Sequence, residues 1–258
     1  MTRAELHEAA GKAPAVTLGF WIIKVLATTF GETAGDTVSM SLNLGYLVGT
    51  AIFLTVLLVL VTAQILAKRF HPFVYWATIV ASTTAGTTMA DYATRSLGIG
   101  YPGGSILLLT LVIASLWAWR LAVGRIETDT VNTPKAEVFY WITITFSQTL
   151  GTALGDWTAG TGGLGYLGAA LIFVVMLGAV AALYAWSGVS RIILFWIAFI
   201  LTRPLGAAVG DFLDKPLDHG GLALSRPVAS AVLAAAIVVL ILVLPQRPGQ
   251  HPTRASTS

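Results

Sequence analysis

One spacing pattern recurs four times along the 258-residue chain, and it constrains the fold more than any other feature of the sequence. Each copy holds a Trp, an Asp 15 residues later, a Gly five residues before that Asp and a second Gly nine residues after it. The four tryptophans are Trp21, Trp76, Trp141 and Trp196, and the four aspartates are Asp36, Asp91, Asp156 and Asp211. Four positions in register across four copies indicate duplication of one structural unit. We therefore expect four equivalent repeats.

The spacing between copies groups the repeats into two pairs. Successive tryptophans are separated by 55, 65 and 55 residues, so the additional residues fall in the middle of the chain, around the polar stretch GRIETDTVNTPKAE. We interpret this stretch as a central connection. The expected organisation is an N-terminal segment at 1–14, repeats at 15–68, 69–123, 137–188 and 189–244, the central connection at 124–136, and a disordered tail at 245–258.

The composition is that of an integral membrane protein. Hydrophobic residues make up 56% of the chain and charged residues 10%, with a mean hydropathy of +0.80. A water-soluble globular domain does not have this balance. Eight apolar runs of about 20 residues match the length of helix that crosses a bilayer. The predicted fold is therefore all-α, with eight transmembrane helices near 15–36, 44–67, 73–94, 104–123, 137–158, 164–186, 189–213 and 222–244.

Each repeat contains two of these runs, so all four copies have the same orientation in the membrane. The expected relation between them is pseudo-symmetry about the membrane normal. Lys and Arg are distributed unevenly over the two sets of connections, with ten on one side and only Arg95, Lys215 and Arg226 on the other. The positive-inside rule then places the protein in the inner membrane with both termini in the cytoplasm. The net charge of +3 thus reflects topology, and we expect the lipid bilayer rather than nucleic acid as the partner.

Small residues four positions apart precede every repeated Asp, in the hexapeptides GETAGD, GTTMAD, GTALGD and GAAVGD. The pairs are Gly31 with Gly35, Gly86 with Ala90, Gly151 with Gly155, and Gly206 with Gly210. Such spacing lets helix backbones approach closely, so we expect tight packing among the first helices of the repeats. Fifteen helical residues span about 22 Å, which puts each Trp and its Asp at opposite ends of one span. The four tryptophans are predicted to be interface anchors on the cytoplasmic side.

The pattern as a whole resembles a known bacterial family. After each repeated Asp, the first three copies continue to a Gly-Tyr pair, which gives the signature W…GxxxGD…GY over roughly residues 17 to 245. This signature is similar to that of uncharacterised membrane-anchored proteins built from a repeat of unknown function. The resemblance implies the four-repeat architecture and no activity, so function has to be argued from the residues.

A polar stripe runs along each first helix from its Asp. Stepping back four, seven and eight residues stays on one helix face. The residues selected in this way include Glu32, Thr29, Thr84, Thr149 and Arg203. A charged side chain at the bilayer centre costs about 2.5 to 3.5 kcal/mol, so these stripes should face each other rather than lipid. We predict a central cluster of the four aspartates with Glu32 beneath them, a Thr-lined path, and Lys24 and Arg203 as charge partners deeper or alongside.

The predicted cluster contains five acids and two bases, an excess of three negative charges. Carboxylate and hydroxyl oxygens suit hard cations such as Mg²⁺ or Mn²⁺, and the absence of cysteine excludes thiolate ligands. Asp36, Glu32 and Asp156 are the candidate metal ligands. We therefore expect a transporter or channel for a small hard cation, coupled to protons or another ion. No cofactor is implied apart from a bound cation.

Two alternatives stay open. In a carrier for a small organic solute, Arg203 and Lys24 would recognise a carboxylate group. In a non-transporting membrane scaffold, the aspartates would pair with bases such as Arg95, four residues after Asp91. The sequence has no nucleophile elbow, phosphate loop or HExxH motif, so we do not expect an enzyme. Nothing in the pattern indicates an oligomeric state.

Overall fold

The computed structural model describes residues 10–67, 69–124, 126, 131, 133–161 and 163–250, and these residues are mostly helical. The eight long helices are α2 (Leu18–Asp36), α3 (Gly45–Leu66), α4 (Pro72–Asp91), α5 (Gly100–Val123), α6 (Pro134–Gly160), α7 (Gly165–Trp186), α8 (Arg191–Asp214) and α9 (Arg226–Val243). The shorter elements are the π-helical turns η1 (Thr37–Ser41) and η2 (Tyr92–Ser96), the 3₁₀ turn η4 (Leu217–His219), and the strands β1 (Ala10–Pro14) and β2 (Pro248–Gln250).

The Gly nine residues after each Asp has a backbone conformation that explains its repetition. Its φ angle is +76° at Gly45, +71° at Gly100, +63° at Gly165 and +80° at Gly220. This left-handed region is accessible to Gly with little strain and is costly for residues with a Cβ. In the first three repeats this glycine is also the first residue of the second helix. The repeated Gly therefore sets the turn between the two helices of a unit.

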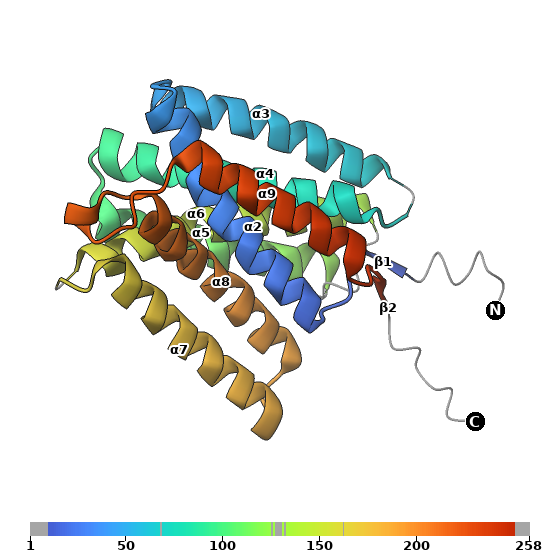
Figure 1. The fold of residues 1–258 in the computed structure, drawn as a ribbon. Coiled ribbons are helices and arrows are strands. Elements are labelled where there is room, and N and C mark those ends of the chain that lie inside the picture. Colours follow the sequence, from blue (N-terminus) through green and yellow to red (C-terminus); the bar gives the residue numbers. More distant parts are fainter. Residues whose placement is uncertain are drawn as a thin grey trace, which may run out of the picture.

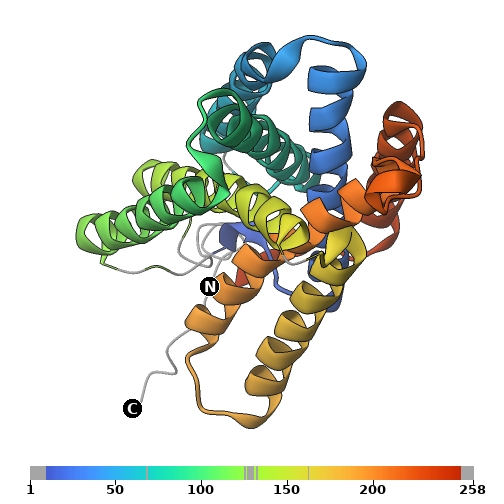
Figure 2. The ribbon, with the colours of Figure 1, turned by 90° about the vertical axis from the view of Figure 1, so that its left-hand side faces the viewer.

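The first helices of the four repeats form a closed ring. α2 packs against α4, α4 against α6, α6 against α8, and α8 against α2 (Figures 1 and 2). The second helices lie outside this ring, each against the first helix of the following repeat: α3 on α4, α5 on α6, α7 on α8, and α9 on α2. The second helix of each repeat therefore packs on the next repeat, and α9 of the fourth repeat packs on α2 of the first.

The repeated glycines lie at the contacts between neighbouring ring helices. In every repeat, the Gly five residues before the Asp faces the position eight residues before the Asp of the next repeat. The four contacts are Gly31 with Thr83, Gly86 with Gln148, Gly151 with Arg203, and Gly206 with Thr28. A second level, one turn nearer the aspartates, pairs Gly35 with Thr87, Gly155 with Ala207, and Gly210 with Glu32. The same close approach therefore recurs at all four helix interfaces.

Alanine at Gly206 is expected to destabilise the protein, because a Cβ there would lie 2.7 Å from the backbone carbonyl carbon of Thr28. Overpacking of this kind costs about 1 to 3 kcal/mol. Thermal unfolding in detergent should show a lower melting temperature for Gly206→Ala. The matched control is Gly178→Ala on α7, where a Cβ meets no atom within 4 Å. Equal melting temperatures for the two variants would contradict the packing role of Gly206.

Among the described residues, five helices are long and apolar enough to cross a membrane: α3, α5, α7, α8 and α9. The outer helices expose large apolar side chains, such as Leu58 (66% exposed), Val175 (71%) and Leu242 (68%). Exposed apolar helix surface of this extent is typical of contact with lipid. α2, α4 and α6 fall outside this set of five; they carry the threonines and charged residues of the ring interior.

The all-α prediction is confirmed, and the structure adds one short sheet near the chain ends. β1 pairs with β2 in an antiparallel two-stranded sheet, so residues near both termini lie together (Figure 1). The tail predicted to be disordered at 245–258 is therefore ordered in part, and residues 251–258 lie outside the described residues. The first nine residues and residues 125, 127–130 and 132 of the central connection also lie outside them.

The tryptophans differ from the predicted interface anchors. Trp76, Trp141 and Trp196 are only 1%, 3% and 6% exposed, and Trp21 packs half-buried against the same core. The residue before each Trp is also aromatic, and the hydroxyls of Tyr75 and Tyr140 lie 2.6 Å apart. The two neighbouring rings of each ring helix pack edge to face, and Tyr140 also packs edge to face on Trp196 of the next ring helix. This end of the ring is thus filled by an aromatic layer. Closure of the ring buries these side chains, and the repeat spacing alone could not predict that burial.

Candidate functional site

The four repeated aspartates lie at the end of the ring opposite the aromatic layer. Each is at or near the end of its first helix, and each is almost fully buried: Asp36, Asp91, Asp156 and Asp211 are 0%, 1%, 7% and 2% exposed. Buried carboxylates are stable only when they are protonated, paired or hydrogen-bonded. The neighbours of these four side chains therefore determine what the site can do.

Two basic residues bridge the aspartates in pairs. Arg95 lies 3.1 Å through Nε from Asp91 Oδ1 and 3.0 Å through Nη2 from Asp156 Oδ2. Lys215 Nζ lies 2.8 Å from Asp211 Oδ1 and also contacts Asp36. Each base follows the Asp of its own repeat by four residues and reaches the Asp of the next repeat around the ring. We call Arg95 and Lys215 the two bridging bases.

Lys215 was missed because the sequence places it in an outer connection. In the structure it is 7% exposed, and its backbone nitrogen donates to the Asp211 carbonyl at 2.9 Å, which holds the residue over the ring. Burial alone would lower the pKa of Lys215, but the carboxylates of Asp211, Asp36 and Asp214 raise that pKa well above its usual value. The signal that could have found Lys215 is its spacing from Asp211, which equals that of Arg95 from Asp91.

The charge balance of the cluster differs from the prediction. Arg226 on α9 adds a further base, 3.5 Å from Asp214 Oδ2 and 3.8 Å from Asp36 Oδ2. The acids of the cluster are Glu32, Asp36, Asp91, Asp156, Asp211 and Asp214, and the bases are Lys24, Arg95, Arg203, Lys215 and Arg226. Counted with the deeper Lys24, as in the predicted set, the acid excess is therefore one rather than three, because bases assigned to the outer connections fold onto the aspartates.

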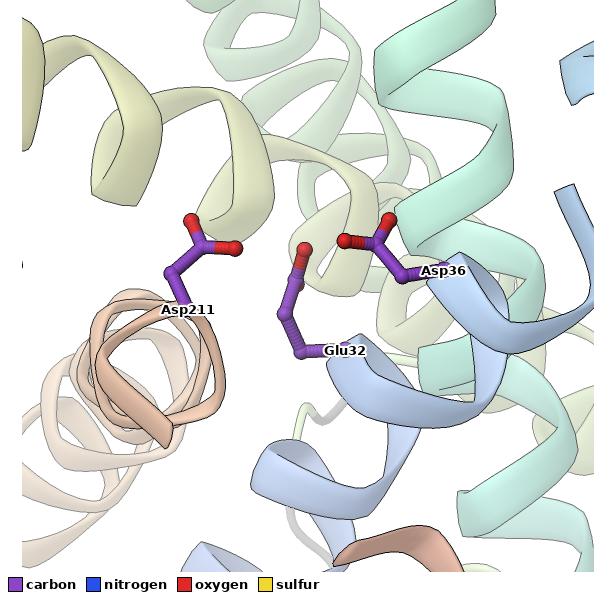
Figure 3. A group of neighbouring side chains, drawn as sticks. All are labelled: Glu32, Asp36 and Asp211. Atoms are coloured by element: carbon purple, nitrogen blue, oxygen red, sulfur yellow. The ribbon is translucent and has the colours of Figure 1, made fainter. Parts of the chain in front are cut away.

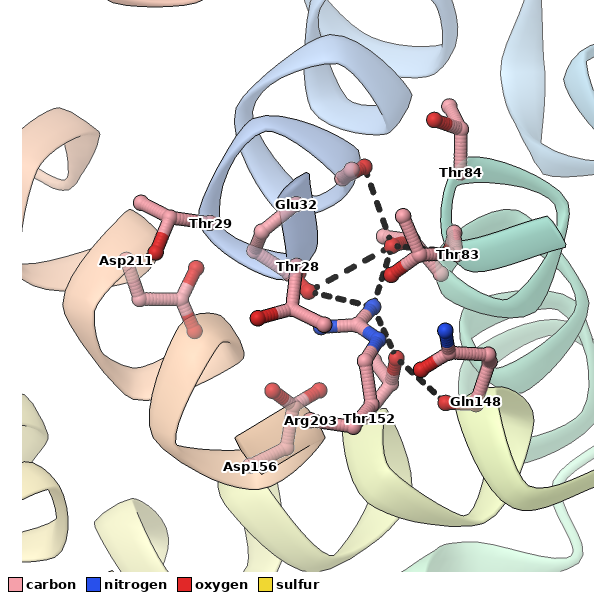
Figure 4. A network of polar contacts seen from close by, with 12 residues as sticks. Thr28, Thr29, Glu32, Thr83, Thr84, Gln148, Thr152, Asp156, Arg203 and Asp211 are labelled. Atoms are coloured by element: carbon pink, nitrogen blue, oxygen red, sulfur yellow. Dashed lines mark hydrogen bonds and ion pairs between the residues drawn. The ribbon is translucent and has the colours of Figure 1, made fainter. Parts of the chain in front are cut away.

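Below the aspartates, Arg203 is the centre of a second network (Figure 4). Its side chain is fully buried, and its Nη2 lies 3.0 Å from Glu32 Oε2. The same Nη2 donates to Thr87 Oγ1 at 2.5 Å and to the Thr152 hydroxyl. Among the described residues, Arg203 Nε and Nη1 have no hydrogen-bond partner. Glu32 and Arg203 are thus directly paired, and part of the guanidinium is free to donate.

The predicted threonine path is placed differently. Thr29, Thr84 and Thr149 are buried, but their hydroxyls donate to carbonyls of their own helices, at 3.0, 2.8 and 2.9 Å. These are the usual local bonds of a helical Thr, and none of the three hydroxyls contacts Arg203 or Glu32 in the described part of the chain. Thr87 and Thr152, four residues before their aspartates, take that place instead.

Lys24 lies deeper and has no acidic partner among the described residues. Its Nζ lies 3.4 Å from Gln148 Oε1 and 4.2 Å from the centroid of the Phe199 ring. The side chain is fully buried. Lys24 therefore sits between the Arg203 network and the aromatic layer, rather than among the aspartates.

Three acids come close enough together to share one ion. Oxygens of Glu32, Asp36 and Asp211 all lie within 4.8 Å of one another, and Figure 3 shows the Glu32 carboxylate between the other two. This set differs from the predicted metal ligands in one member, because Asp156 is turned to Arg95 while Asp211 takes its place. An all-carboxylate set suits hard cations. Lys215 and Arg203 already contact these carboxylates, so a cation would have to displace them in part.

Comparison with protein families gives one match. A family model described as Repeat of Unknown Function (DUF347) matches residues 19–70, 74–124, 139–190 and 194–246. No curated protein and no solved structure matches the chain. The four matched stretches correspond to the four repeats deduced from the Trp and Asp spacing.

Proposed function

The chain belongs to the DUF347 repeat family, and we propose that it is a membrane transporter or channel for a small hard cation, coupled to protons or another ion. The observation that carries this proposal is the buried group of Glu32, Asp36 and Asp211, with oxygens within 4.8 Å of one another. Acidic side chains inside a membrane protein are costly and usually mark ion pathways. The excess of one acid over the bases also favours a positively charged ligand.

The proposal includes eight membrane spans in the inner membrane, with both termini in the cytoplasm. α2 and α6 pack against α8 in the ring, α4 packs against α2 and α6, and α8 is apolar enough to span. The apolar outer helices shield these three from lipid, so their threonines and charges face the interior. The ring axis then lies along the membrane normal, and the excess of Lys and Arg on one set of connections sets the orientation.

Transport requires that the carboxylates exchange partners. In the closed arrangement, Lys215 holds Asp36 and Asp211, and Arg203 holds Glu32. An arriving cation would be bound by the oxygens that these bases release. The aromatic layer closes the other end of the ring, so release on that side would require the aromatic side chains to move. A divalent ion in Mg²⁺-like coordination would keep several of its own waters.

Uptake into proteoliposomes tests the proposal. Asp36→Asn is expected to reduce Mn²⁺ and Mg²⁺ uptake to the level of empty liposomes, because the neutral amide leaves only two of the three carboxylates. Folding should persist, since Lys215 keeps Asp211 as a partner. Asp218→Asn is the control, because that side chain is 78% exposed. Asp36→Asn protein that is folded and transports like the wild type would reject the proposal.

One observation favours a second candidate, a carrier for a small organic anion. Arg203 Nε and Nη1 and Gln148 Nε2 are buried donors without partners among the described residues, and Lys24 lies beside Gln148. A carboxylate ligand would satisfy these groups. In that case the protein would take up an organic acid, and Gln148→Leu would abolish this uptake.

The ion pairs of the aspartates also fit a non-transporting scaffold. For a scaffold, Asp36→Asn would lower the yield of folded protein and change nothing else.

A further inference from the structure

A cavity of about 180 Å³ opens between α6 and α8, beside the ring of aspartates. Its walls include Asp156 and Asp211, the tyrosines Tyr101 and Tyr166, His219, and Arg95, whose guanidinium is paired with Asp91 and Asp156. One water takes about 30 Å³ of liquid, so the space accommodates several waters or a cation that keeps part of its hydration shell. Polar groups line a large part of it, which distinguishes it from an apolar packing defect.

The repeat pattern explains why the cavity lies there. In the second and fourth repeats, the residue four positions after the Asp joins it to the Asp of the next repeat: Arg95 joins Asp91 to Asp156, and Lys215 joins Asp211 to Asp36. The first repeat has Met40 at this position. The third repeat has Gly160 at this position. Gly160 lines the cavity, and a Cβ added to it would meet no atom within 4 Å. No side chain of α6 therefore fills the space between Asp156 and Asp211.

One buried carboxylate oxygen beside the cavity has no partner among the described residues. Asp156 is 7% exposed and lines the cavity, and its Oδ1 has no hydrogen-bond partner among the described residues. Its other oxygen, Oδ2, is held by Arg95. Asp211, on the opposite wall, belongs both to this cavity and to the group with Glu32 and Asp36. Asp211 thus connects the cavity to the proposed ion site.

We propose that the cavity at Gly160 is the access route and outer binding site through which a hydrated hard cation reaches Glu32, Asp36 and Asp211. This inference rests on the proposed function. The cation binds first between Asp156 and Asp211, where the tyrosine hydroxyls and carboxylates replace part of its water. It then passes along Asp211 to the inner group. The route depends on the gap at Gly160, so the third repeat is functionally distinct from the others.

The absence of cysteine from the chain makes the route testable by single-cysteine labelling. Gly160→Cys is reconstituted and treated with a cationic, membrane-impermeant methanethiosulfonate. Leu217→Cys, at a position 73% exposed on η4, identifies the side of the membrane that the cavity faces. Gly178→Cys, on the exposed surface of α7, is the lipid-facing control. We expect Gly160→Cys to react from the same side as Leu217→Cys, and Gly178→Cys not to react.

Two further readouts tie the cavity to the cation. Mn²⁺ at ten times its dissociation constant should slow the modification of Gly160→Cys about tenfold, by occupancy of the site, without slowing that of Leu217→Cys. Modification of Gly160→Cys should also block Mn²⁺ uptake. Failure of Gly160→Cys to react where Leu217→Cys reacts would overturn the route, as would modification that leaves uptake intact. Absence of uptake by the unmodified wild type would instead overturn the proposed function, and protection by Mn²⁺ would still decide whether the cavity binds a cation.

Discussion

Replacing Arg203 by methionine is expected to lower the free energy of unfolding by about 3 to 5 kcal/mol, the usual cost of breaking a buried ion pair. Glu32 would keep a buried carboxylate whose partner at 3.0 Å is gone. Thr87 and Thr152 would lose the guanidinium that donates to both hydroxyls. Methionine fills a similar volume, so most of the loss comes from the unpaired charge rather than from a void. Chemical unfolding in detergent measures the effect.

The double variant Arg203→Met with Glu32→Gln separates charge pairing from packing. Removing both charges is expected to cost less than the sum of the two single changes, by about 0.5 to 3 kcal/mol for directly contacting groups. Arg203→Lys is not expected to restore stability, because an ammonium lacks the planar fork that reaches several acceptors at once. Strict additivity of the two single variants would mean that the contact between Arg203 and Glu32 contributes nothing to stability.

The repeat and its packing contacts could be predicted because they depend on spacing alone. The Trp to Asp distance identified the first helix of each unit, and the family match covers the same four stretches. The small residues at Gly31, Gly151 and Gly206 indicated close helix contacts, and each does face a side chain of the next repeat. What the spacing could not give is the partner of each outer helix, since packing on the next repeat depends on ring closure.

The acids of the candidate site could be predicted from the sequence more fully than its bases. The four aspartates share one helix position, so a ring of equivalent helices must bring them to one level. Lys215 lies beyond its helix, and only the folded connection, held by hydrogen bonds from Lys215 to Asp211 and from Ala223 to Lys215, brings it over the ring. The threonines posed a different difficulty. Helix periodicity placed Thr29 and Thr87 on the Asp-bearing faces of α2 and α4, and both hydroxyls bond a carbonyl of their own helix. Only Thr87, one turn nearer its Asp, also contacts Arg203.

Lys215→Met is expected to make folding depend on divalent cations. Without the ammonium, Asp36 and Asp211 lose the base between them, and the expected destabilisation is again about 3 to 5 kcal/mol. Mg²⁺ or Mn²⁺ can then take the place that Lys215 leaves beside Glu32, Asp36 and Asp211. A ligand at a hundred times its dissociation constant stabilises by about 2.7 kcal/mol, so much of the loss should be recovered. The melting temperature in detergent, followed against metal concentration, measures this recovery.

The response to metal and a control variant distinguish this effect from a loss of packing. The carboxylates raise the pKa of Lys215 in the folded protein. Its stabilisation is therefore fully present below the usual lysine value of about 10.4 and is lost only as pH rises through the folded-state pKa. Titration of Lys215 itself should therefore add no pH dependence to the deficit of Lys215→Met below about pH 9. Lys135→Met, which removes an exposed lysine bonded to the Ala122 carbonyl, should show neither the deficit nor the response to metal.

If metal raised the melting temperatures of wild type and Lys215→Met equally, the ammonium and the cation would not share a site. The exchange of partners proposed for transport would then lack its first step, because a cation that does not compete with Lys215 does not reach Asp36 and Asp211.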